Sequence, residues 1–408
     1  MKPASTNEFR RGAKPLLGAT IGAGCGLSSI SFYTHGVFVP AISADTNWSR
    51  GDVQLGVTIM ILMAVVSAPA VGFLIDRFGA RKVALGSIPI YGLTLASFSL
   101  VGNSLTNYYV VWAMMSLLAA GTLPLTWTRV VNAWFDKSRG LALGITLAGT
   151  GIAATFAPSY VNTLISHFGW RDAYALLALT ATLIALPVVY AFFRDPPQAI
   201  AAQNAAKPEQ TGFAFADAIR SYRFWLMAIG ILLVAAGIGG LITNTFPMLL
   251  DRGLSATEAA GYMGLIGVSV IMGRLIVGAL LDRFWAPLIA AIFLAAPCIS
   301  AMIFSGQSVS PLMITVAVLI VGLAAGAELD LMAYLVSRYF GLASYGALYG
   351  ALYVFFSIGA GIAPFAFGKA YDTFGSYDPI LALVAGMSIA GAVLLLFLGP
   401  YPRQYARS

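Results

Sequence analysis

Gly72-Phe-Leu-Ile-Asp-Arg-Phe78 and Gly278-Ala-Leu-Leu-Asp-Arg-Phe284 are two copies of one segment, 206 residues apart. Two further segments obey the same offset: Gly140, Gly144 and Pro158 fall on Gly346, Gly350 and Pro364, and Phe168, Gly169 and Asp172 fall on Phe374, Gly375 and Asp378. Chance similarity between apolar segments would need a new offset each time. One register for three segments therefore predicts two homologous halves joined in the middle.

The composition excludes a soluble globular protein. Hydrophobic residues make up 59% of the 408 residues, charged residues make up 10%, and the mean hydropathy is +0.85, whereas soluble domains carry roughly 25% charge. Twelve apolar stretches have the roughly 20 residues needed to cross a bilayer, near 15–41, 52–75, 82–102, 107–133, 139–166, 171–193, 222–250, 258–281, 286–305, 311–337, 344–371 and 377–399. The predicted fold is an all-α membrane protein with an N-terminal six-helix bundle (1–193), a cytoplasmic linker (194–221) and a C-terminal six-helix bundle (222–408).

The distribution of Lys and Arg sets the expected orientation. Basic residues precede the first span without a small-residue cleavage site, so this span is expected to be a retained helix and not a signal peptide. Seventeen of the 23 Lys and Arg residues fall in the segments that a twelve-helix topology places inside, and four fall outside. Both termini are therefore expected in the cytoplasm. Topology explains the net charge of +7 and leaves no basic cluster that favours a nucleic-acid partner.

Catalytic and metal-binding constellations are not evident in the sequence. Cys25 and Cys298 lie in different predicted helices and are expected to be ordinary core residues, and His35 and His167 lie far apart in the chain. A membrane-embedded enzyme would need paired catalytic groups or metal ligands. We therefore expect no enzyme activity and no cofactor.

The connection between the second and third spans reads Gly72-x-x-x-Asp76-Arg77-x-Gly79-x-Arg81-Lys82 and resembles the signature of the major facilitator superfamily. The resemblance implies that the glycine lets two helices touch and that the charged residues form a gating relay at the cytoplasmic face. The second copy keeps Gly278, Asp282 and Arg283 but has Trp285 and Ala286 where Arg-Lys would follow, so a weaker gating role is expected there. The alternative for both copies is a plain positive-inside turn.

Further segments resemble the bacterial monocarboxylate and oxalate/formate porter branch of that superfamily. They are Gly36-Val37-Phe38 with Trp48-Ser49-Arg50, Trp134-Phe135 with Arg139-Gly140-Leu141-Ala142, Gly169-Trp170-Arg171 and Gly326-Ala327-Glu328. The resemblance implies a multi-pass protein of the bacterial inner membrane that carries a small organic anion.

Two arginines lie inside apolar helices. A guanidinium near the bilayer centre costs roughly 2.5–3.5 kcal/mol on insertion scales and cannot escape by losing its proton. In the resembled family a helix-eight arginine at the place of Arg274 binds the substrate carboxylate; the alternative is an arginine locked to Glu328 or Asp330. Arg129, with Asn132 nearby, is either a second anion contact, a gate that pairs with an acid of helix ten, or a residue that snorkels to the interface.

Glu328 and Asp330 are the two acids that lie within a predicted span, both in the tenth. Positions two apart are roughly 200° apart around a helix, so one is expected to face the cavity and the other to pack between helices. Either can be the proton carrier, and a structural pair that holds helices together is the alternative.

Aromatic residues supply the remaining candidate contacts. Tyr33 is expected at the cavity wall, and Tyr345, Tyr349, Tyr353 and Phe356 form a stripe on one face of the eleventh span, which suits either lipid contact or a ligand with an apolar body. In the oxalate-type pattern helix eleven contributes a lysine to the site, whereas the basic residue of this span, Lys369, lies at its outer end. A monocarboxylate is therefore expected.

The sequence thus predicts a secondary transporter that takes up a monocarboxylate with protons by alternating access, as a monomer. The alternatives are an organic-anion exchanger of the oxalate/formate type and a membrane sensor that does not transport.

Overall fold

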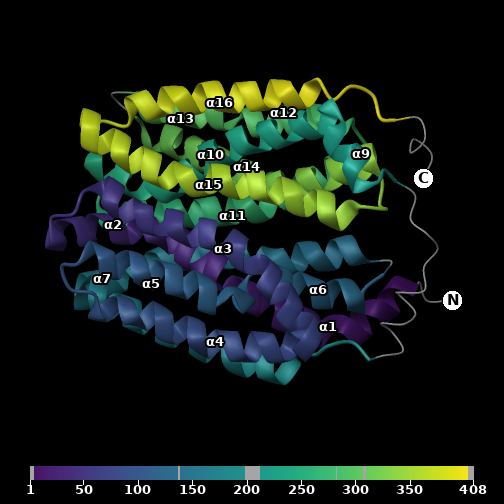
Figure 1. Cartoon of the computed structure of the whole chain (residues 1–408). Coiled ribbons are helices and arrows are strands. Elements are labelled where there is room, and N and C mark those ends of the chain that lie inside the picture. Colours follow the sequence, from purple (N-terminus) through teal and green to yellow (C-terminus); the bar gives the residue numbers. More distant parts are fainter. Residues whose placement is uncertain (1–3, 137, 198–211, 282, 307–308, 403–408) are drawn as a thin grey trace.

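The structure is a computed structural model that describes residues 4–136, 138–197, 212–281, 283–306 and 309–402. Helices form two bundles, one from α1–α7 and one from α10–α16. The second bundle lies above the first in Figure 1. Within the described ranges the chain pairs as a β-bridge at one place, between Gly212 and Gly341. The predicted all-α architecture is confirmed.

The first bundle contains α1 (Ala4–Gly24), η1 (Leu27–Ser31), α2 (Phe32–Thr46), α3 (Arg50–Phe78), α4 (Ala80–Ala96), η2 (Ser97–Leu100), α5 (Leu105–Leu118), η3 (Ala120–Thr122), α6 (Pro124–Trp134) and α7 (Arg139–Phe192). After α9 (Phe215–Arg220), the second contains α10 (Tyr222–Asp251), α11 (Ala256–Leu281), α12 (Ala286–Ala295), α13 (Pro297–Ser305), α14 (Pro311–Phe340), α15 (Tyr345–Phe374) and α16 (Asp378–Leu396).

Among the described residues, nine helical segments are long and apolar enough to cross a membrane. Twelve predicted spans become nine because local breaks divide some spans and a merged helix joins two others. A π-helical turn divides the first span between α1 and α2, and η3 with Pro124 divides the fourth between α5 and α6. α7 contains the fifth and sixth spans, which meet at Gly169.

Positive φ angles at glycine mark the ends of matching helices in the two halves. Gly169 has φ 79° and Gly375, its counterpart at the offset of 206, has φ 67°; both values lie in the region that glycine adopts without steric cost. Gly79 has φ 85°, whereas its counterpart Trp285 has φ −66°. The halves therefore share the turn after the fifth and eleventh spans and differ in the turn after the second and eighth.

The beginning of α3 is capped by its own first residues. The hydroxyl of Ser49 accepts a hydrogen bond from the backbone N–H of Asp52 at 3.2 Å, and the Asp52 carboxylate accepts one from the backbone N–H of Ser49 at 3.3 Å. This reciprocal capping box satisfies two backbone donors that have no partner inside the helix.

The start of α1 and the end of α16 lie at one end of the molecule, at the right of Figure 1. We call it the terminal end, and we call the opposite end, where α3 begins and α10 ends, the distal end.

Contacts between the bundles are concentrated in the distal half. A methyl group added at Gly264 or Gly267 of α11 would meet the backbone of Thr155 in α7, and one added at Gly368 of α15 would meet the backbone of Arg50 and Gly51. Towards the terminal end of α3, α7 and α15, by contrast, five glycines have no described neighbour within 4 Å of such a methyl group: Gly72, Gly140, Gly144, Gly346 and Gly350. The bundles therefore touch at the distal end and stand apart at the terminal end.

Small residues hold α11 against α14 within the second bundle. A methyl group at Gly326 would lie against the carbonyl oxygen of Val270, and one at Gly273 would lie against the backbone of Leu323. This spacing brings the two helix backbones into direct contact.

We expect Gly326→Ala to lower the melting temperature of the detergent-purified protein, because overpacking costs about 1–3 kcal/mol. Gly350→Ala is the matched control, since open space surrounds that position and alanine favours the helix by about 1 kcal/mol. Equal melting temperatures for the two variants would contradict the close α11–α14 contact.

Candidate functional site

Arg274 and Asp330 form an ion pair between α11 and α14. Nη1 of Arg274 donates to one carboxylate oxygen of Asp330 at 3.2 Å. The arginine side chain is 9% exposed and that of Asp330 is 33% exposed, and the Nε–H of Arg274 has no hydrogen-bond partner among the described atoms. The guanidinium is therefore neutralised, yet part of its donor fork is unused. Of the alternatives for Arg274, the structure contains the contact with Asp330.

Glu328 lies on a different face of α14 from Asp330, as the spacing of two residues predicts. The residue is 4% exposed, and its Oε1 has no hydrogen-bond partner among the described atoms. Tyr33 of α2, in the first bundle, is within electrostatic range of both Glu328 and Arg274. The first bundle therefore brings Tyr33 near this charged centre.

The tyrosine stripe of α15 runs past the same centre. Successive rings are stacked, with centroid distances of 5.9 Å from Tyr345 to Tyr349, 6.4 Å from Tyr349 to Tyr353 and 5.4 Å from Tyr353 to Phe356. Tyr349 is within electrostatic range of Asp330 and Arg274. The aromatic face therefore lies beside the ion pair, and all four rings are half-buried.

Arg129 lies apart from this centre, near the terminal end of the first bundle. Its guanidinium donates to Asp76 of α3, and the two side chains are 46% and 64% exposed. A small cavity of about 190 Å³ beside it is lined partly by Ala133, Gly79 and Asp195. Asn132 is half-buried on the same helix. In this structure Arg129 thus pairs within its own bundle.

The residues of the first signature segment do not form one cluster. Arg77 is exposed and packs against the ring of Phe78 at 5.5 Å. Arg81 donates to the carbonyl oxygen of Tyr190 at 2.8 Å. In the second copy Arg283 is exposed, and Asp282 lies outside the described residues.

Neither signature glycine packs against a helix in this structure. A methyl group at Gly72 or at Gly278 would have no described atom within 4 Å. The helix contact that the resemblance implies for Gly72 is therefore not made here.

Sequence reasoning missed the pairing of Arg129 with Asp76. Both residues lie within about two turns of the terminal ends of α3 and α6, and these spans run in the same direction. The sequence did place Arg129 and Asp76 at the same depth in the membrane, on two helices of one bundle. A cation and an acid in such positions can form an ion pair, so this pairing could have been predicted.

Two helix bundles that touch at one end, with embedded charges between the helices, are typical of membrane transport proteins built from two homologous halves. The profile of the Major Facilitator Superfamily matches residues 21–364. The chain belongs to this superfamily, so the predicted family is confirmed, and this is a family of transporters and not of enzymes.

Curated relatives include transporters of this kind. The chain is similar to the MFS transporter asaE of Aspergillus flavus, with 25% identity over 83% of this chain and 75% of that protein. It is also similar to Monocarboxylate transporter 11 of Mus musculus, with 27% identity over 64% of this chain and 58% of that protein. A crystal structure of a bacterial homologue of the human lysosomal transporter Spinster, in an inward-facing and occupied conformation, has the same fold, with a TM-score of 0.66, 18% identity and coverage of 96% and 95%.

We expect Arg274→Met and Asp330→Met each to lower the free energy of unfolding by more than the double variant does. Arg274 is buried and Asp330 is partly exposed, so removing one partner should cost up to about 3–5 kcal/mol, the range for a buried charge left without compensation, whereas removing both can be nearly neutral. Thermal unfolding in detergent measures the three variants.

The exposed ion pair of Arg129 with Asp76 is the control for this set of three variants. Asp76→Asn should cost less than about 1 kcal/mol, because exposed ion pairs contribute little. Additive losses at Arg274 and Asp330 would contradict their coupling.

Proposed function

We propose that this protein is a proton-coupled uptake transporter of a small monocarboxylate, in which Arg274 holds the substrate carboxylate. The observation that supports this proposal most is that the guanidinium of Arg274, at the α11–α14 contact, has a hydrogen-bond donor without a partner among the described atoms. Nη1 of Arg274 donates a hydrogen bond to one carboxylate oxygen of Asp330, while its Nε–H has no hydrogen-bond partner among the described atoms. A planar fork of this kind suits a carboxylate bound through two hydrogen bonds.

The ion pair suggests how a proton and an anion share one centre. Asp330 is the counter-ion of Arg274 in this structure. A proton on Asp330 removes that negative charge, and the substrate carboxylate then takes its place beside the guanidinium. Proton and anion move together without net charge, so the pH gradient drives uptake with little direct work from the membrane potential.

The surrounding side chains give the substrate its expected shape. Tyr33 comes from the first bundle, and Tyr349 and Tyr353 come from the stacked face of α15. These rings suit a ligand with an apolar body and one charged end. The similarity to Monocarboxylate transporter 11, a protein named for that substrate class, supports the same proposal.

The excess of Lys and Arg in loops favours the terminal end as the cytoplasmic one. On that orientation the bundles are open to the cytoplasm in this structure and closed to the outside. The protein would lie in a bacterial inner membrane and work as a monomer, with the bundles of residues 1–193 and 222–408 rocking about the central site and 194–221 linking them.

Gating at the cytoplasmic end falls to Asp76, Arg77 and Arg81, with Gly72 as the contact point and the second-copy residues Gly278, Asp282 and Arg283 as a weaker partner. Arg129, paired here with Asp76, belongs to this gate; its alternative role, with Asn132, is a second anion contact. Exchange of Asp76 between two basic partners would give the gate two arrangements of similar energy.

We expect Arg274→Lys to weaken carboxylate binding about tenfold or more, because lysine keeps the charge and loses the bidentate fork. Binding is measured by thermal shift with a panel of short aliphatic, hydroxy and aromatic carboxylates, which also identifies the substrate class. Transport into proteoliposomes is measured with the carboxylate that shifts the wild type most.

Arg171→Lys is the matched control, because that arginine pairs with Asp45 at the distal end of the first bundle and is far from the proposed site. Wild-type affinity and transport in Arg274→Lys would rule out the carboxylate clamp.

We expect uptake to rise as the external pH falls, and Asp330→Asn to remove that dependence. Glu328→Gln is the comparison, since Glu328 is the other embedded carboxyl, and loss of pH dependence in that variant alone would assign the proton to Glu328. Counterflow that persists after the proton gradient is collapsed would favour the alternative function, an exchanger of organic anions. Binding without movement into proteoliposomes would favour a sensor.

A further inference from the structure

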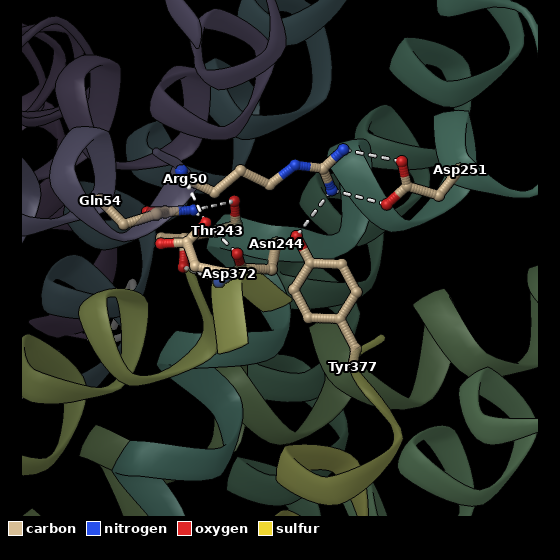
Figure 2. Close-up of polar contacts among 7 residues, drawn as sticks. All are labelled: Arg50, Gln54, Thr243, Asn244, Asp251, Asp372 and Tyr377. Atoms are coloured by element: carbon tan, nitrogen blue, oxygen red, sulfur yellow. Dashed lines mark hydrogen bonds and ion pairs between the residues drawn. The ribbon is translucent and has the colours of Figure 1, made fainter. Parts of the chain in front are cut away.

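The distal end contains a polar cluster that none of the roles above uses. Arg50, the first residue of α3, donates from two nitrogens to both carboxylate oxygens of Asp251, the last residue of α10, at 2.6 and 2.7 Å. Nη1 of Arg50 also donates to the hydroxyl of Tyr377 at 3.0 Å (Figure 2). The arginine belongs to the first bundle, and both acceptors belong to the second.

This ion pair is partly shielded from solvent. The side chains of Arg50 and Asp251 are 18% and 29% exposed, and the guanidinium lies over the ring of Tyr371 at 3.8 Å. A bidentate pair with an aromatic face beside it contributes more than an isolated surface pair, because its geometry is fixed and its charges are less screened.

A second layer joins the backbone of α3 to the other bundle. The carboxylate of Asp372, in α15, accepts hydrogen bonds from the backbone N–H groups of Arg50 at 3.0 Å and Gly51 at 2.8 Å (Figure 2). A negative charge at this place also complements the positive end of the helix dipole. Gly368 permits the contact, since a methyl group there would meet the backbone of Arg50 and Gly51.

A third layer lies one turn deeper. Nε2 of Gln54 donates to the carbonyl oxygen of Thr243 at 3.2 Å and to Oδ1 of Asn244 at 2.9 Å. The side chains of Gln54 and Asn244 are fully buried, so these bonds exist in surroundings that offer few other partners.

The three layers share one property, which is that every donor comes from the first bundle and every acceptor from the second. Separation of the bundles at this end must break all of them together. We propose that Arg50, Gln54, Asn244, Asp251, Asp372 and Tyr377 form a distal latch that holds the conformation open at the terminal end and sets how often the transporter opens at the distal end. This assignment adds gate residues to the proposed transport cycle and rests on that cycle.

A neighbouring ion pair provides an internal comparison. Arg171 of α7 donates to Asp45 of α2 at 2.5 Å, also at the distal end, but both residues belong to the first bundle. Rigid-body movement of the bundles leaves this pair intact. The pair therefore has the charge chemistry of the latch without its position between bundles.

The test measures the distance between the bundles without any substrate. Spin labels are placed on Asn103 and Ser305, two exposed residues at the distal end, through Asn103→Cys and Ser305→Cys. The full-length chain also carries Cys25→Ala and Cys298→Ala, which remove its own cysteines. Electron–electron double resonance in lipid nanodiscs then gives the populations of short and long distances. We expect Asp251→Asn and Asp372→Asn each to raise the ratio of long to short distances about tenfold, the scale of a lost charge-assisted hydrogen bond.

Asp45→Asn is the control and should leave the distances unchanged. Arg50→Gln should shift the ratio at least as far as Asp251→Asn, because it also removes the hydrogen bond to Tyr377. The double variant Arg50→Gln/Asp251→Asn should shift it no further than Arg50→Gln alone, because Asp251 acts through Arg50. Unchanged distances in Asp251→Asn and Asp372→Asn, or an equal shift in Asp45→Asn, would overturn the latch. The readout needs no carboxylate, so failure of the Arg274→Lys test leaves this result unaffected, and the reverse also holds.

Discussion

A permanently charged guanidinium inside an apolar helix needs a counter-ion, and the arrangement of the second bundle depends on this requirement. Arg274 cannot lose its proton, and it lies where water is scarce. Asp330 provides the counter-ion only because α11 and α14 approach through Gly273 and Gly326. The glycines, the acid and the arginine therefore act as a unit, and a change in any one alters the electrostatics of the other two.

The internal repeat explains why this unit occurs once. At the offset of 206, Arg274 falls on Ala68 and Asp330 on Pro124. Where α14 runs unbroken past Asp330, the first bundle has the break between η3 and α6 at Pro124. The first bundle carries its own pair of a helix-two acid and a helix-four arginine, Asp76 with Arg129, near the terminal end. The two homologous bundles thus each contain an ion pair between their second and fourth spans. The acid and the arginine have exchanged helices, and the two pairs lie at different depths.

Most of the fold was predictable from the sequence, and less of the site. Hydropathy and the repeat gave the spans because membrane helices must satisfy their own backbone and cover it with apolar side chains. Spacing on one helix separated Glu328 from Asp330, but it left the partner of Arg274 open between them. Contacts such as Arg50 with Asp251 or Asp372 were not predictable, because they join residues 201 and 322 positions apart and exist only in one arrangement of the bundles.

The capping box at the start of α3 gives this helix a form of independence. Ser49 and Asp52 bind one another through local contacts within the first bundle, whereas Asp372 reaches the same helix end from the second. In the proposed cycle the bundles part at this end, and the first turn of α3 then keeps its local cap while water takes the place of Asp372. Because that turn need not fray, α3 can move as a rigid body, and the motion requires no step of unfolding and refolding.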